Sequence, residues 1–162
     1  MTLVTMKVMT LKNFPSFRIV RRTIFFLALV LVILRPVPGR STDTNSLLSP
    51  FEEKLLEFIN QYRTNHGLHP LLFDPGLYKL AKKHSTYMDE RDELSHDHFD
   101  ERFEQSGKSF CAENVGWNSR TPDAQFRAWR SSQGHNVNML NEKVRKAGIS
   151  RVDAYVTFFT CD

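Results

Sequence analysis

The chain has 162 residues, about the length of one domain, and it carries 22 Lys and Arg against 18 Asp and Glu. Residues 1–39 hold six of the basic residues and no acidic one, so taking those six from the 22 leaves 16 basic against 18 acidic residues, a formal charge of −2. The sequence isoelectric point near 9.2 therefore describes the N-terminal segment. The rest of the chain lacks the basic excess that a nucleic-acid partner requires.

The N-terminal segment has the composition of an export signal. Residues 1–22 contain five Lys and Arg and no acid, and they precede the uncharged run TIFFLALVLVIL at 23–34. That run is shorter than the roughly 20 residues that span a bilayer. A basic segment, a short apolar core and then small residues are typical of a secretory signal peptide, and we expect cleavage after Gly39. The alternative is an uncleaved membrane anchor.

This interpretation divides the chain into a signal peptide over 1–39, a polar linker over 40–48 and one domain over 49–162. We expect the mature protein to be secreted, into the medium or the cell envelope, and to be a monomer.

Three helices are predicted from a shared start signal, in which a side-chain acceptor precedes a proline. These pairs are Ser49-Pro50, Asp74-Pro75 and Thr121-Pro122, and they predict helices over about 50–65, 75–91 and 122–132. Glu52 stands three residues after Ser49, which adds a capping box. The first two helices each have one apolar face, comprising Phe51, Leu55, Leu56, Phe58, Ile59 and Tyr62 in the first and Leu77, Leu80, Ala81, His84 and Met88 in the second.

Strands are predicted late in the chain. The segment RVDAYVTFFT at 151–160 is rich in β-branched and aromatic residues, and residues 145–150 before it are placed to pair with it through a tight hairpin. Residues 109–117 mix apolar and polar side chains without a clean period. Helices grouped early and an antiparallel pair late predict an α+β domain with helices packed on a small sheet.

Both cysteines, Cys111 and Cys161, follow the predicted signal peptide. In an exported protein such a pair favours a disulfide, and the alternative is two buried thiols. Closing a loop of about 50 residues would stabilise the fold by about 3–4 kcal/mol in the chain-entropy model.

The sequence contains none of the common catalytic or cofactor-binding motifs H-E-x-x-H, Walker A, G-x-G-x-x-G, G-x-S-x-G and paired C-x-x-C. The candidate functional residues are therefore scattered histidines and one carboxylate. His84 lies on an apolar helix face and is interpreted as a packed core residue. His96 and His98 would face one side in extended backbone. His135 follows Gly134, which can turn its ring toward a cleft. The other histidines, His66 and His69, are expected in a solvated turn.

Glu113 lies between residues that look buried, and a buried charge requires a partner. Backbone N–H groups, a histidine or a metal ion would each serve.

Three segments in order, LSHDHF, CAENVG and WRSSQGHNVNML, resemble the CAP superfamily, which unites cysteine-rich secretory proteins, antigen five and pathogenesis-related proteins in the SCP domain. The short SSQGHNVNML segment is similar to the compact bacterial branch. The resemblance covers about residues 52–160. It implies a three-layer α-β-α sandwich with a small, mainly antiparallel sheet and a cleft that holds two histidines and two acidic residues, where the histidines can bind zinc.

Carried over by position, the resemblance assigns His96 and His135 as the metal-binding histidines and Glu113 as the first cleft acid. The second acid should stand three residues after Trp129, and that position is Ser132. Two imidazoles and one carboxylate would bind zinc weakly, with positions left open. The alternative is a buried hydrogen-bonded network without metal. His98 and the acids around it are expected to form a solvated rim, comprising Asp92, Glu93, Asp97, Asp100 and Glu101.

The leading functional hypothesis is an extracellular binding module for an unidentified ligand, with no enzymatic activity. The first alternative is a metal-dependent hydrolase, such as a protease, that uses His96, His135 and Glu113. The second is a sterol- or lipid-binding protein, in which Phe99, Phe103 and Phe110 would line a groove or belong to the core.

Overall fold

The computed structural model describes residues 47–162. The predicted signal peptide and most of the predicted linker lie outside the described residues. No helix among residues 47–162 has the length and apolar character needed to cross a membrane.

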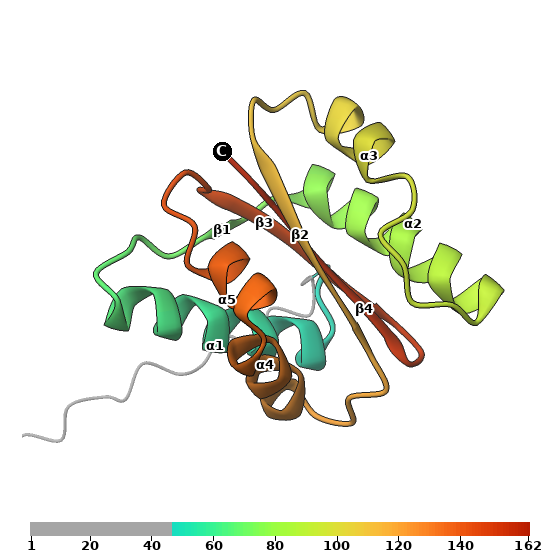
Figure 1. The fold of residues 1–162 in the computed structure, drawn as a ribbon, viewed down its shortest axis with the longest axis horizontal. Helices are drawn as coiled ribbons and strands as arrows, with labels where there is room; N and C mark the ends of the chain where they lie inside the picture. Colours follow the sequence, from blue (N-terminus) through green and yellow to red (C-terminus); the bar gives the residue numbers. More distant parts are fainter. Residues whose placement is uncertain (1–46) are drawn as a thin grey trace, which may run out of the picture. The chain divides into compact units, whose positions relative to one another are not determined.

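Residues 47–162 form a four-stranded sheet with helices on both faces (Figure 1). The helices are α1 (Pro50–Asn65), α2 (Pro75–Arg91), α3 (Phe99–Ser106), α4 (Pro122–Ser131) and α5 (Gln133–Met139). The strands are β1 (Leu72–Phe73), β2 (Cys111–Trp117), β3 (Lys146–Val152) and β4 (Tyr155–Cys161). Helices α2 and α3 cover one face, and α1, α4 and α5 cover the other (Figure 1). The predicted α-β-α sandwich is confirmed.

The strand order is β1-β3-β4-β2, which leaves β2 at one edge. β1 runs parallel to β3, while β3–β4 and β4–β2 are antiparallel, so the sheet is mainly antiparallel as expected. Cys111 stands directly opposite Cys161 in the β2–β4 register, and the two are joined by a disulfide. The disulfide prediction is confirmed and the alternative of two thiols is wrong.

All three predicted helix starts are present. The side chain of Ser49 accepts from the backbone N–H of Glu52 in a complete capping box, and the side chains of Asp74 and Thr121 accept from backbone N–H groups of the first turns of α2 and α4. Each cap satisfies donors that a helix N-terminus otherwise leaves without a partner. Local side-chain chemistry therefore fixes where these three helices begin.

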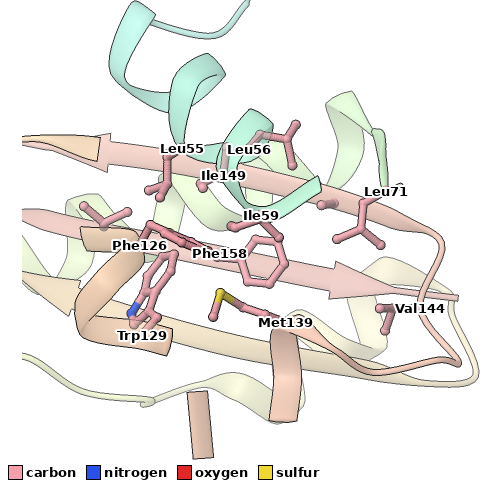
Figure 2. Packing of buried hydrophobic residues seen from close by; sticks show 12 residues of the cluster. Leu55, Leu56, Ile59, Leu71, Phe126, Trp129, Met139, Val144, Ile149 and Phe158 are labelled. Atoms are coloured by element: carbon pink, nitrogen blue, oxygen red, sulfur yellow. The ribbon is translucent and has the colours of Figure 1, made fainter. Parts of the chain in front are cut away.

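The largest apolar cluster lies between the sheet and the layer of α1, α4 and α5 (Figure 2). Leu55 and Ile59 of α1 and Phe158 of β4 are fully buried there, and Trp129 of α4 joins them. Burying side chains of this size contributes about 1.5–3 kcal/mol each, so this layer supplies much of the driving force for folding.

Three short elements were not predicted, namely β1, α3 and α5. Each has two to eight residues, too few to establish a period. Residues 109–117 had no period because β2 is buried on both faces. The late hairpin is confirmed, but it turns at Asp153 and Ala154, so Arg151 and Val152 belong to the first of its strands.

Candidate functional site

A cleft of about 700 Å³ opens along the β2 edge of the sheet. It brings together four of the residues that the sequence analysis selected, His96, Glu113, Ser132 and His135. His96 comes from the loop between α2 and α3, Glu113 from β2, and the other two from the junction of α4 with α5. The remaining lining residues are Gln133, Gly134, Val137 and Asn138.

Glu113 is the buried centre of this site, with a side chain that is 1% exposed. Arg102 of α3 donates two parallel hydrogen bonds to the Glu113 carboxylate, from Nε to Oε2 at 2.9 Å and from Nη2 to Oε1 at 2.8 Å. Paired N–H donors of this kind make the strongest ion pairs in proteins. The carboxylate is thus neutralised in place, and Arg102 is the partner that the sequence analysis missed.

The signal for Arg102 was present but weak. Arg102 stands three residues after Phe99, which packs against the apolar cluster around Leu77 of α2, so both lie on the inward face of α3. Because the surrounding residues are mostly acidic, the segment looked like a solvated rim.

His96 also bonds to Glu113, through a hydrogen bond of 2.9 Å between Nδ1 and Oε1. Since a carboxylate accepts, Nδ1 carries a proton, and in the neutral ring the opposite nitrogen, Nε2, keeps its lone pair. The His96 ring is 53% exposed, whereas Glu113 beneath it is almost fully buried. Glu113 therefore orients an accessible imidazole at the cleft surface.

His84 approaches the same carboxylate from α2. Its Nε2 donates to the backbone carbonyl of Ser95 at 2.8 Å and lies 3.8 Å from Oε1 of Glu113. Burial lowers the pKa of His84, and Arg102 adds to that effect while Glu113 opposes it. The interpretation of His84 as a packed core residue is confirmed, although it packs against the centre of the site.

His135 reaches the cleft from α5, whose position is held by asparagine side chains. Asn114 donates to the backbone carbonyl of His135 at 3.0 Å, and Asn138 donates to the backbone carbonyl of Glu113 at 3.0 Å. These bonds cover part of the β2 edge and set α5 against it. Burial, and then the neighbouring His96, lower the pKa of His135, which keeps its ring neutral at pH 7.

A second buried arginine fixes the far end of α5. Arg63 of α1 is fully buried and donates to the backbone carbonyls of Met139 at 2.7 Å and Asn141 at 3.0 Å, as well as to those of His69 and Val144. A cation beside the last carbonyls of a helix is favourable. The helix that carries His135 is therefore anchored to both the sheet and α1.

The loop before α3 separates His98 from His96. The two rings would face one side only in extended backbone, and the backbone is not extended here, because His98 has a φ of 60° and its ring bonds to Glu101. The left-handed turn directs the two rings apart. Its half-exposed ring and exposed partner do place His98 on the solvated rim, as expected.

The phenylalanines proposed for a sterol groove do not line the cleft. Phe99 and Phe110 pack against the two apolar clusters, and Phe103 stacks on Phe99 with ring centroids 6.5 Å apart. Sterol binding remains a prediction.

The site fits a metal ion only weakly. Among residues 47–162 no group of three or more His, Cys, Asp or Glu side chains is arranged to hold one. His96 and His135 offer two imidazoles in one cleft, while Glu113 is already engaged by Arg102 and His96. A zinc ion would therefore have two protein ligands, one fewer than catalytic zinc sites normally supply.

Comparison with known proteins gives matches over most of the described chain. A sequence model of the CAP family, described as the cysteine-rich secretory protein family, matches residues 56–162. The uncharacterized protein YkwD of Bacillus subtilis is 30% identical over 122 residues, covering 70% of this chain and 47% of that protein. The chain spans less than half the length of the curated relatives it matches.

Solved structures share the fold. An extracellular protein of Bacillus anthracis with an SCP domain matches with a TM-score of 0.65 and 23% identity, over 72% of this chain and 44% of that one. An outer surface protein of Borrelia burgdorferi matches with a TM-score of 0.64 and 19% identity, over 68% of this chain and 90% of that one. The similar proteins of this set thus include extracellular and surface proteins.

Proposed function

This chain belongs to the cysteine-rich secretory protein (CAP) family, and from that premise we propose that it acts outside the cell as a binding module. Its ligand-binding surface is the cleft that contains His96 and His135. The extracellular and surface proteins among its structural neighbours support this location.

The hydrogen bonding of the Glu113 carboxylate favours binding rather than hydrolysis as the function of the cleft. It is the one carboxylate among the described residues that line the cleft, and both of its oxygens are hydrogen-bonded, to Arg102 and to His96. A general base needs a free basic group within reach of the water or substrate proton that it removes. Ser132 lines the cleft where a second acid would stand, and a hydroxyl does not replace a carboxylate in this role.

The two histidines give the cleft its ligand-binding chemistry. His96 presents Nε2 because Glu113 holds Nδ1–H, an arrangement that also orients metal-bound histidines. Burial lowers the pKa of His135, which favours the neutral ring with its one nitrogen lone pair. A zinc ion bound here would supply a Lewis acid with open positions for a ligand's oxygen atoms.

A zinc titration by calorimetry tests the pairing of the histidines. We expect one weak, saturable site that is lost in both His96→Ala and His135→Ala. His69→Ala is the matched control, because His69 lies in an exposed loop. The absence of a site in the wild-type protein, or its survival in either cleft variant, would contradict the proposal.

The alternative of a metal-dependent hydrolase makes the opposite prediction for Glu113. Hydrolysis of a peptide or ester substrate that falls at least 100-fold in Glu113→Gln, with the fold retained, would establish the carboxylate as a base and overturn the binding proposal.

A further inference from the structure

The segment that carries His96 belongs to no helix or strand. It lies between α2 and α3, and residues 93–96 have no regular secondary structure. Helical or sheet hydrogen bonding therefore does not fix His96, whose ring is half-exposed at the surface of the cleft. The position of this ring depends instead on the side chains that hold the neighbouring backbone.

His84 holds the backbone directly before His96. It lies on α2, is 2% exposed, and donates from Nε2 to the backbone carbonyl of Ser95 at 2.8 Å. This carbonyl belongs to the planar peptide group whose nitrogen is the backbone nitrogen of His96. A hydrogen bond to the carbonyl therefore fixes the orientation of the peptide plane that leads into His96.

Arg102 holds the backbone directly after His96. In addition to its two hydrogen bonds to Glu113, Arg102 donates from Nη1 to the backbone carbonyl of Asp97 at 2.6 Å. Arg102 is almost fully buried, as is His84 on the other side of the loop. The two carbonyls that flank His96 are thus held by buried side chains of the two neighbouring helices.

The donor of His84 acts on the loop and not on Glu113. Nε2 of His84 lies 3.8 Å from Oε1 of Glu113, which is beyond hydrogen-bond distance. That oxygen already accepts from His96 and Arg102. The one N–H of the neutral His84 ring is directed at Ser95 instead. Removing this donor therefore releases the loop while it leaves the Arg102–Glu113 pair in place.

We propose that His84 is a positioning residue of the cleft, which holds the His96 ring in place through the carbonyl of Ser95. This inference rests on the proposed function, in which His96 and His135 bind one ligand together. Two imidazoles bind the same zinc ion only when a nitrogen of each lies about 2.0–2.1 Å from it. Loss of a group that orients such a ligand typically lowers metal affinity roughly 10- to 100-fold.

His84→Gln and His84→Met form the matched pair of variants, because the two side chains have similar lengths and only glutamine can donate to Ser95. Ser85→Ala is the control for loss of a buried hydrogen bond in the same helix, since the Ser85 hydroxyl bonds to β3 and β4 rather than to the loop. If His84→Met does not fold, His84→Asn replaces it, because the asparagine amide ends one methylene short of the carbonyl.

The first readout is the tautomer of the His96 ring, measured by ¹⁵N NMR at pH 8 without metal. We expect the Nδ1–H form in the wild-type protein, His84→Gln and Ser85→Ala. His84→Met should give a mixture of both tautomers, because a displaced ring loses its hydrogen bond to Glu113. A purely structural role of His84 would change stability and leave the tautomer of the folded protein unchanged. An unchanged tautomer in His84→Met overturns the proposal, as does a mixture in the wild-type protein or in His84→Gln.

The second readout is the zinc affinity of the cleft, measured by calorimetry. His84→Met should bind zinc at least tenfold more weakly than the wild-type protein, whereas His84→Gln and Ser85→Ala should stay within about threefold of it. Equal affinities of His84→Met and His84→Gln overturn the positioning role. The absence of zinc binding by the wild-type protein contradicts the proposed function instead, and the tautomers then decide the role of His84.

Discussion

The two helical layers that cover the sheet stabilise the fold by different means. The layer of α1, α4 and α5 covers one large cluster of buried apolar side chains, and its buried polar side chains are Glu52, Arg63 and Gln125. The layer of α2 and α3 has two smaller apolar clusters and, between them, buried polar groups such as His84, Ser85 and Arg102. Ser85 lies 2.9 Å from the hydroxyl of Thr157 on β4 and is part of a hydrogen-bonded contact between helix and sheet.

This difference shows which layer contains the buried ion pair. Apolar burial is non-directional and tolerates exchange of similar side chains, whereas a buried ion pair fixes its partners' positions. The Arg102–Glu113 pair holds His96 at the cleft, and Arg102 also lines a separate cavity of about 180 Å³ between α2 and α3. The loop and helix of the polar layer therefore supply His96 and its support, whereas His135 comes from α5 in the layer that covers the large apolar cluster.

The largest effect is expected from removing the partner of Glu113. Arg102→Met should lower the free energy of unfolding by about 3–5 kcal/mol, because it leaves the buried Glu113 carboxylate without its charged partner and with only the hydrogen bond from His96. Adding Glu113→Met should restore much of that loss. Arg127→Met is the matched control, because it breaks an exposed pair with Asp123 and should cost less than about 1 kcal/mol. Urea denaturation measures all four proteins, and equal effects of the two single arginine variants would contradict the buried-pair account.

The next largest effect on stability is expected from removing apolar volume from the layer of α1, α4 and α5. Leu55→Ala should cost about 2–5 kcal/mol, because Leu55 is fully buried in the large cluster and its loss leaves a cavity. Leu72→Ala makes the same chemical change at a side chain that is 65% exposed. We expect a smaller loss there in urea denaturation, and similar losses at both positions would show that the cluster is not the main apolar core.

The smallest effect is on the dependence of stability on pH. Burial lowers the pKa of His84 and of His135 below the ordinary histidine value. The ordinary pKa of histidine is near 6.5. At pH values between 6.5 and the lower pKa values of the two folded histidines, the unfolded chain binds more protons than the folded chain. Stability should therefore fall as the pH drops from 7 toward 5.

The double variant His84→Gln/His135→Gln should show a flatter dependence over the same interval, whereas His66→Gln, at an exposed position, should not change it. Urea denaturation at pH 7 and pH 5 compares the slopes. An unchanged slope in the double variant would assign the pH dependence to other groups.

Sequence patterns predicted local features better than contacts between segments that are distant in the chain. Helix starts could be predicted because Ser49, Asp74 and Thr121 act on their own first turns. The cleft residues were found through motif resemblance, and the structure places His96, Glu113 and His135 along it. The ion pair could not be predicted in the same way, because Arg102 and Glu113 meet only when α3 packs against β2. The left-handed turn at His98, which separates it from His96, likewise has no local signature.

The central claim is that Glu113, held by Arg102, orients His96 and does not act as a free base. The most direct test is the tautomer of each histidine ring, measured by ¹⁵N NMR at pH 8. The account predicts that His96 carries its proton on Nδ1, bonded to Glu113, and that His84 carries its proton on Nε2, bonded to Ser95. A proton on Nε2 of His96 would contradict the account, because Nδ1 could not then donate to Glu113 and the ring would have no free nitrogen facing the cleft.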